Sequence, residues 1–318
     1  MTIACGAPER DIKETLVFEQ EDLKTIIESE PPFETTTGIS EPSNEKLFVW
    51  RISSVYGSAF LMGSVHLGID AIYPLDSSIE EAYEIADNLV VEVDISNVDP
   101  ITTTQLLMEY GTYPEGESLK GNLSEDLYNR LSGLFGDSGI SILMMDGFRP
   151  WVISTLIEEM QLEEMGYSAE YGIDVYFIKK AKEDAKNIIE LETAEYQLEL
   201  LSSLSDELMI AVIEDILDNP PTQEDMDRLF NAWESGDTKL LESVVFDDIA
   251  ETPMFEPYYD RIYTERNYQM AEKIEEFMAD DLVYFIVAGA AHLVGEDGLL
   301  SILEDRGYEV TQLLRRGD

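Results

Sequence analysis

Apolar and polar positions mark strands and helices along the chain from about Lys46 onward. Residues 47–52 and 59–62 are short apolar runs, and the turn between them contains Gly57. Two such runs joined by a short turn predict a β-hairpin. Residues 89–93 form a third apolar run, which indicates a buried strand.

A helix is predicted between the hairpin and the third strand, and it opens at Asp76. Ser77 and Glu80 have the spacing of a capping box at its start. The apolar positions that repeat at helical spacing are Ile79, Ala82, Tyr83 and Ala86. A strand, a helix and a strand in a segment of this length predict a βαβ unit, whose two strands run parallel.

The remainder of the chain combines long helical segments with short strands. Residues 122–184 and 194–279 have largely helical patterns, and they flank a short strand at 187–191. Three further elements close the chain: a strand at 282–288, a helix at 298–303 and a strand at 308–313. We therefore expect an α/β fold in which a mainly parallel central sheet, starting with the β-hairpin, is surrounded by helices and carries large helical insertions.

The first 45 residues do not share this pattern. They are rich in acidic residues and contain the pair Pro31-Pro32, so we expect a flexible acidic leader before a single α/β domain at residues 46–318. The segment Ile3-Ala4-Cys5-Gly6 resembles the end of a bacterial lipoprotein signal, although the charged and apolar regions of such a signal are missing. A lipid on Cys5 would anchor an extracytoplasmic protein to a membrane; without it we expect a soluble protein.

The charge balance excludes one class of partner. The chain has 67 acidic and 20 basic residues, a net charge of −47. Nucleic acids and anionic membranes bind proteins through Lys and Arg, so this surface repels them. No apolar run approaches the roughly 20 residues that span a bilayer. With one cysteine, the chain forms no intrachain disulfide and no cysteine-based metal site.

The only two histidines of the chain occur in the same local pattern. His66 follows Gly63 by three positions, His292 follows Gly289 by three, and each pattern follows an apolar run. We interpret each glycine as the point at which a strand ends in a sharp turn. The two imidazoles would then project above the carboxyl ends of the strands, where open α/β sheets bind ligands. The alternative is a pair of buried histidines with only structural contacts.

Glu92 is the acidic residue that breaks the third apolar run. We expect its strand to lie next to the strand that precedes His66, so that Glu92 and the histidines share one site. Two imidazoles and a carboxylate suit Zn, Mn, Fe or Co. The alternative for Glu92 is a buried salt bridge to an arginine. Asp94 shares the strand end but faces the other way in a regular strand.

Three further charged residues are candidates for the same site. Glu192 follows the strand at 187–191 and could be a ligand, a general base or the start of a helix. Arg266 shares a helical stripe with apolar residues, so it needs a buried acidic partner or a substrate oxyanion. Asp174 is expected to cap a helix, with a place in the site as the alternative.

Several known catalytic arrangements are absent from the sequence. It contains no H-E-x-x-H helix, no phosphate-binding Walker loop and no G-x-S-x-G nucleophile elbow. A cysteine nucleophile is excluded because Cys5 lies in the leader.

At the level of motifs the chain resembles the TraB/GumN family, which includes the animal TIKI proteins. The matching stretches run in the family's order from residue 46 to 314. They are residues 60–68, 73–75, 90–94, 148–151, 172–174, 191–193, 265–267, 288–293 and 307–308. One departure is Ser64-Val65, where the family commonly has Thr-Ile.

The resemblance implies a fold akin to erythromycin esterase and the haem-binding ChaN proteins. It implies that the paired Gly-x-x-His motifs and a strand-end glutamate define the site. TIKI proteins are described as metal-dependent peptidases acting on Wnt proteins, and TraB relatives as inhibitors of peptide pheromones. Those substrates do not transfer to this chain.

Residues and resemblance together predict a metal-dependent hydrolase, with a peptidase as the first choice. His66, Glu92 and His292 would hold Mn, Co or Zn, Glu192 or Glu92 would act as base, and Arg266 would stabilise an oxyanion. The substrate would be a peptide or a small molecule. One alternative is a non-catalytic protein that binds haem, a metal or a peptide. Another is a metal-free esterase that uses the histidines as general bases.

Overall fold

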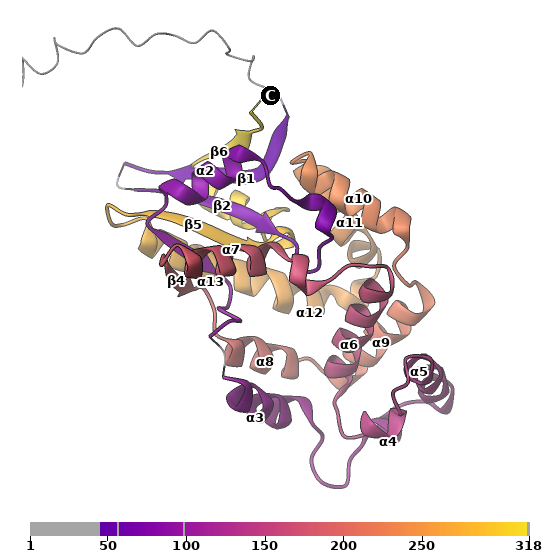
Figure 1. The fold of residues 1–318 in the computed structure, drawn as a ribbon. Coiled ribbons are helices and arrows are strands. Elements are labelled where there is room, and N and C mark those ends of the chain that lie inside the picture. The colour runs from indigo at the N-terminus through magenta and orange to yellow at the C-terminus, as the bar shows by residue number, and fades with distance from the viewer. Residues whose placement is uncertain (1–44, 56, 98, 317–318) are drawn as a thin grey trace, which may run out of the picture. The chain divides into compact units, whose positions relative to one another are not determined.

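The computed structural model of the chain describes residues 45–55, 57–97 and 99–316 (Figure 1). The expected leader, apart from Glu45, and its Cys5 lie outside the described residues. In the described part, no helix combines the length and the apolar character needed to cross a membrane.

A six-stranded sheet lies at the centre of the described region, with the strand order β4-β3-β5-β2-β1-β6. The strands are β1 (Lys46–Ser53), β2 (Ser58–Ser64), β3 (Asn88–Val91), β4 (Asn187–Glu190), β5 (Val283–Gly289) and β6 (Glu309–Leu314). Strands β4, β3, β5 and β2 pair in parallel, whereas β1 is antiparallel to both β2 and β6. The sheet is therefore mixed, and the expectation of a mainly parallel sheet was wrong. The sheet is mixed because the short turn of the hairpin reverses the chain between β1 and β2, and β6 then pairs with the free edge of β1 in the antiparallel direction.

Strand β3 does not lie where the sequence suggested. It pairs with β4 and β5, so β5 separates it from β2. The helix that connects β2 to β3, α2 (Ser77–Ile85), contacts β5. Its N-cap is Asp76, whose carboxylate accepts a hydrogen bond from the amide of Ser78 at 2.9 Å, so the expected capping box of Ser77 and Glu80 does not form.

Helices surround this sheet and extend beyond it. Those of the first helical insertion are α3 (Pro100–Gly111), α4 (Leu119–Asn122), α5 (Glu125–Asp137), α6 (Pro150–Glu164) and α7 (Ile173–Glu183). The second insertion contains α8 (Ala194–Ser202), α9 (Asp206–Asp218), α10 (Gln223–Glu234), α11 (Thr238–Glu251), α12 (Glu256–Tyr259), the π-helix η5 (Asp260–Thr264) and α13 (Glu265–Phe277). The helices α14 (Ala290–Leu293) and α15 (Leu299–Asp305) lie between β5 and β6. The expected helical insertions are thus present.

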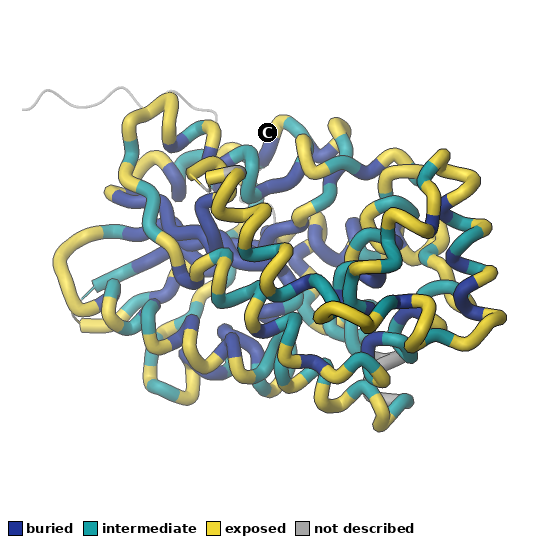
Figure 2. The backbone as a smooth tube through the Cα atoms, turned by 90° about the horizontal axis from the view of Figure 1, so that it is seen from below, coloured by how far each residue is buried: buried dark blue, intermediate teal, exposed yellow. Residues whose placement is uncertain are grey.

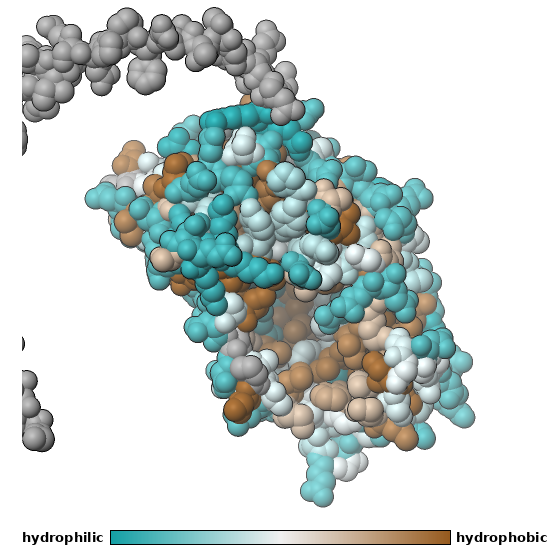
Figure 3. Space-filling view, in the orientation of Figure 1, coloured by the Kyte–Doolittle hydropathy of each residue, from teal (hydrophilic) through white to brown (hydrophobic). Residues whose placement is uncertain are grey.

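Apolar side chains in the described region form two large cores and a third, smaller one around Trp151. The strands and the inner faces of α2, α7 and α13 share the main core, in which Leu61, Leu89 and Phe285 are fully buried. A second core, around Leu131 and Phe135, joins α5, α6 and α9. Figure 2 shows the buried strands inside and the exposed outer faces of the helices. In Figure 3 the surface is hollowed between the sheet-bearing part and helices α3 and α8, with hydrophobic side chains visible in the hollow.

Candidate functional site

The two Gly-x-x-His patterns lie side by side because β2 and β5 are parallel neighbours. In their register Gly63 lies opposite Ala288, and Ser64 opposite Gly289. His66 follows β2 directly, and His292 lies in the short helix α14 that follows β5. Both imidazoles therefore reach the same edge of the sheet, as the sequence predicted.

Gly289 lies at the point on which three of the candidate residues converge. A β-carbon built on Gly289 would lie 3.3 Å from Oε1 of Glu92, 3.4 Å from Nε2 of His66 and 3.4 Å from Cδ2 of His292. Although β3 is not next to β2, Glu92 reaches this point because β3 borders β5 on its other side. The structure thus brings His66, Glu92 and His292 together.

The two motif glycines serve close packing and not the expected sharp turns. Gly63 lies inside β2, and Gly289, the last residue of β5, has a φ of −50° that other residues also adopt. A β-carbon on Gly63 would lie 2.5 Å from Cδ1 of Phe48 and 3.0 Å from Cα of Ala290. Glycine is needed at Gly63 because the ring of Phe48 fills the space of a side chain, whereas at Gly289 the three side-chain atoms at 3.3–3.4 Å leave only narrow room for a β-carbon.

His66 is anchored by a carboxylate. Its Nδ1 lies 2.8 Å from Oδ2 of Asp174, and the Ser64 hydroxyl donates to Oδ1 of the same carboxylate at 3.1 Å. Asp174 lies in the first turn of α7, whose N-cap is Gly172, so the expected capping role was wrong. The charge of the Asp174 carboxylate raises the pKa of His66 to about 9. The His66 side chain remains 64% exposed, with Nε2 directed toward Gly289.

His292 is anchored by an amide in the interior. Its Nδ1 lies 2.6 Å from Oδ1 of Asn267, whose own amide nitrogen donates to the carbonyl of Asp297 at 2.8 Å. This second bond assigns the orientation of the Asn267 amide, so Nδ1 of His292 carries the hydrogen and Nε2 keeps its lone pair. Burial lowers the pKa of His292 to about 4. The centroid of the Tyr263 ring lies 5.4 Å from that of its imidazole.

Arg266 joins the two candidate glutamates in a buried cluster. Its Nη2 donates to Oε2 of Glu92 at 2.6 Å and to Oε2 of Glu192 at 2.7 Å, and its Nε donates to Oε1 of Glu192 at 2.9 Å. Gly289 adds a backbone N–H at 2.7 Å to Oε1 of Glu92. Burial by itself raises the pKa of Glu92, but nearby His292 and Arg266 outweigh it and lower that pKa to about 2. Glu92 therefore has the salt bridge that the sequence left as an alternative.

The strand ends explain why the two glutamates meet. The parallel pairing of β3 and β4 continues past both strands, so the backbone N–H of Glu192 donates to the carbonyl of Glu92 at 2.8 Å. Gln197 donates to Oε2 of Glu192 at 2.9 Å. Asp94 stays outside this cluster, because its Oδ1 accepts from the backbone N–H of Ser96 at 3.1 Å.

The same backbone bond between Glu192 and Glu92 keeps their carboxylates close together on Arg266. Arg266 itself is delivered by α13, where it is buried on the same face as Met270 and Ile274, as its place in the apolar stripe predicted. Although burial opposes it, the hydrogen bond with Glu192 and the charge of Glu92 raise the pKa of Arg266 further. The guanidinium is therefore permanently charged.

Two residues of the cluster were missed by the sequence reasoning. Asn267 orients His292, and a signal for it existed: it is a polar residue at helical spacing from the buried Ala271 and Ile274. Gln197, which holds Glu192, lies on a helix without any comparable pattern. Its role depends on the tertiary structure alone.

The cluster fits a divalent cation only in part. No group of three or more His, Cys, Asp or Glu side chains in the described part of the chain has the spacing of a metal site. The imidazoles match the pattern of metal-binding histidines, in which Nδ1 is held by a second residue and Nε2 is left for the metal. The carboxylate of Glu92, in contrast, is engaged by Arg266 and Gly289, and its Oε1 lies 4.0 Å from Nε2 of His292.

Comparison with known proteins places the chain among relatives that share most of its length. It is 29% identical to the uncharacterized protein YbaP of Escherichia coli over 244 residues, which cover 76% of this chain and 86% of YbaP. It is 21% identical to the metalloprotease TIKI2 of Danio rerio over 337 residues, which cover 87% of this chain and 63% of TIKI2. It is 22% identical to the metalloprotease TIKI1 of Homo sapiens over 324 residues, which cover 83% of this chain and 61% of TIKI1.

No solved structure gives a significant match. The sequence pattern of the TraB/PrgY/gumN family matches residues 48–312, which is most of the chain and includes every residue of the cluster. The family suggested by the motifs is thereby confirmed, and the chain belongs to the TraB/PrgY/gumN family.

Proposed function

We propose that this protein is a metal-dependent hydrolase that cleaves peptide bonds. The observation that carries the proposal is the convergence of His66, His292 and Glu92 on the space beside Gly289. The names of the TIKI relatives support it at the level of the family.

In this proposal the two histidines hold the cation through Nε2, with Glu92 beside them. Asp174 and Asn267 keep the imidazoles in the orientation that presents Nε2. A divalent Mn, Co or Zn ion bound there would polarise a substrate carbonyl and lower the pKa of a water molecule.

The remaining charged residues have roles in the same proposal. Glu92 or Glu192 takes a proton from the attacking water, and Arg266 stabilises the oxyanion that develops. The hydrogen bonds of Arg266 to both glutamates hold its guanidinium in place without substrate. Such preorganisation is what an oxyanion donor requires.

Metal content and peptide cleavage test this proposal together. The purified protein is expected to contain or take up Mn, Co or Zn, and to cleave members of a peptide library only when loaded. His66→Ala is expected to keep its fold, because this side chain is largely exposed, and to lose both metal and activity. Arg130→Ala, which alters an exposed ion pair with Asp218, is the control and should retain both. Full metal content in His66→Ala would refute the ligand assignment.

A metal-free hydrolase is the second candidate, and one observation favours it. His292 is neutral at pH 7, its Nε2 lone pair is free, and Glu92 is already engaged by Arg266. This arrangement suits a general base, as in the esterase whose fold the family resemblance implies. Cleavage that persists in strong chelator would select this candidate. Haem binding with a Soret band, without cleavage of any peptide or ester, would select the non-catalytic alternative.

A further inference from the structure

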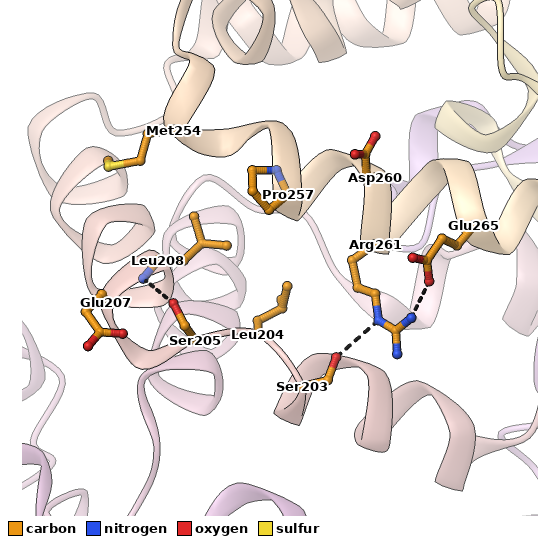
Figure 4. A pocket seen from close by; sticks show the side chains of 10 residues that line it. All are labelled: Ser203, Leu204, Ser205, Glu207, Leu208, Met254, Pro257, Asp260, Arg261 and Glu265. Carbon is orange, nitrogen blue, oxygen red and sulfur yellow. Dashed lines mark hydrogen bonds and ion pairs between the residues drawn. The ribbon is translucent and has the colours of Figure 1, made fainter.

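A cavity of about 750 Å³ lies next to the segment that carries Arg266 (Figure 4). It is open to solvent and is lined by the connection between α8 and α9, the start of α9, and the segment from η4 (Pro253–Phe255) through α12 and η5 to α13. Its volume is in the range of sites that bind small molecules or short peptide segments. None of the residues that line it belongs to the cluster around Gly289.

The cavity combines an apolar wall with acidic side chains. The apolar wall consists of Leu204, Leu208, Met254 and Pro257. Glu207 and Asp260 also line the cavity, and in the described part of the chain neither carboxylate has an ion pair or a side-chain hydrogen bond. Figure 4 shows both carboxylates without a bonded partner among the residues drawn.

The arginine in this cavity is already engaged. Arg261 is paired with Glu265, which lies one turn further along the helix, and its Nε donates to the hydroxyl of Ser203 at 3.1 Å. The charge of Arg261 is thus balanced by Glu265, and Glu207 and Asp260 leave the cavity with an excess of negative charge. A cationic group complements this charge, and an aliphatic stem complements the apolar wall.

The helical segment beside the cavity also connects it to the histidine cluster. Arg261 and Glu265 occupy the face toward the cavity, whereas Arg266 lies one residue further on and donates through Nη1 to the carbonyl of Ile262 at 3.1 Å. A ligand in the cavity would therefore contact the same segment that positions Arg266 against Glu92 and Glu192. The cavity and the histidine cluster thus share this helical segment.

We propose that this cavity binds a peptide segment in which a lysine or arginine stands beside apolar residues. The aliphatic part of the basic side chain and its apolar neighbours pack on Leu204 and Leu208, and the cationic end pairs with one of the two carboxylates, Glu207 or Asp260 (Figure 4). The inference rests on the proposed function in one respect, that this peptide is the substrate of the histidine cluster. Binding itself can be measured without cleavage.

Fluorescence anisotropy with labelled peptides tests the binding. The probe is a heptapeptide with one central lysine between leucines, and its partners carry N-acetyllysine or glutamate at that position. The wild-type protein is expected to bind the lysine peptide about tenfold more tightly than the acetylated one, since acetylation removes the charge and keeps the stem. Glu207→Gln/Asp260→Asn is expected to remove this preference.

The net charge of −47 attracts any cationic peptide, so a matched control is needed. Glu304→Gln/Asp305→Asn makes the same change in charge at the end of α15, away from the residues that line the cavity. It should leave the preference for lysine within about twofold of the wild type. Equal losses in both double variants, or equal binding of lysine and acetyllysine peptides, would overturn the proposal.

His66→Ala separates this inference from the proposed function. It should bind the lysine peptide as tightly as the wild type, because His66 does not line the cavity. Binding with the lysine preference but no cleavage by the wild type would refute the hydrolase and leave the cavity assignment standing. Cleavage without any preference for basic peptides would refute the cavity assignment and leave the hydrolase standing.

Discussion

His66 and His292 end the same sequence pattern on neighbouring parallel strands, yet their surroundings are opposite. The side chain of His66 is 64% exposed and that of His292 is 5% exposed. His66 is held by the carboxylate of Asp174, and His292 by the neutral amide of Asn267. The pKa of His66 is raised to about 9, whereas that of His292 is lowered to about 4. In the free protein at pH 7, one imidazole is charged and the other is neutral.

This difference shows that the shared Gly-x-x-His pattern determines where each imidazole lies but not its pKa. Both imidazoles reach the same edge of the sheet because their strands are paired in register. Their protonation depends on residues from distant segments, Asp174 of α7 and Asn267 of α13. A neutral, buried base beside an exposed, charged imidazole is an asymmetric pair, and environment produces the asymmetry.

The largest effect is expected from removing the charge of Arg266, which lies with Glu92 beside the buried His292. Arg266→Met should lower the free energy of unfolding by about 3–5 kcal/mol, because it leaves Glu92 and Glu192 buried without a cationic partner. Urea unfolding measures the loss. Arg130→Met, which removes an exposed pair with Asp218, should cost no more than about 1 kcal/mol. Similar losses in the two variants would contradict a buried, interdependent cluster.

Substitutions of the two motif glycines should also have different effects. Gly63→Ala should cost about 1–3 kcal/mol of stability, because its β-carbon would meet the ring of Phe48, which is itself packed edge-on against Trp50. Gly289→Ala should cost less, since its β-carbon meets only side-chain atoms, at 3.3–3.4 Å. It should instead abolish metal or ligand binding by filling the space between the histidines. Thermal unfolding and elemental analysis of both variants give the comparison; a stable, metal-replete Gly289→Ala would show that this space is not the site.

Much of the fold follows from local patterns in the sequence. The apolar runs predicted the strands, because a strand that is buried on both faces has few polar positions. The pairing order did not follow: β3 lies beside β5, and the sheet is mixed. The antiparallel part begins with the hairpin, which the local pattern did predict. The pairing order depends instead on which strand returns to which edge of the sheet after the long helical insertions, and no local pattern records that choice.

In the candidate site, the histidines and charged residues were predictable from the sequence, whereas most of the residues that orient them were not. His66, His292, Glu92, Glu192 and Arg266 are marked by a repeated motif or by a charge in an apolar pattern, and the structure brings all five together. The residues that orient them are less visible. An amide such as that of Asn267 is uncharged, so its value as a hydrogen-bond partner emerges only when the fold places it against His292.

Removing the Asn267 amide should cause a moderate loss of stability, through the surroundings of the buried His292. Asn267→Ala leaves the Nδ1–H of His292 and the carbonyl of Asp297 without their partner, which should cost about 1–3 kcal/mol in unfolding free energy. Asp174→Asn should cost less than about 1 kcal/mol, since His66 is exposed to water that can replace the lost bond. Equal destabilisation in urea would show that burial does not distinguish the surroundings of His66 from those of His292.

The smallest effect is a shift in titration, and the chain is well suited to its measurement because it has only two histidines. In NMR spectra recorded with chelator, one imidazole of the wild type should titrate near pH 9 and the other near pH 4. Asp174→Asn should move the higher pKa down, because the neutral amide no longer favours the charged imidazole, and should leave the lower one in place. The stabilisation from the charged pair is fully present below the ordinary histidine pKa of about 6.5 and is lost as the pH rises through about 9. The difference in stability between Asp174→Asn and the wild type should therefore shrink over that interval. If both imidazoles of the wild type titrate near pH 6.5, the difference in charge between His66 and His292 is refuted.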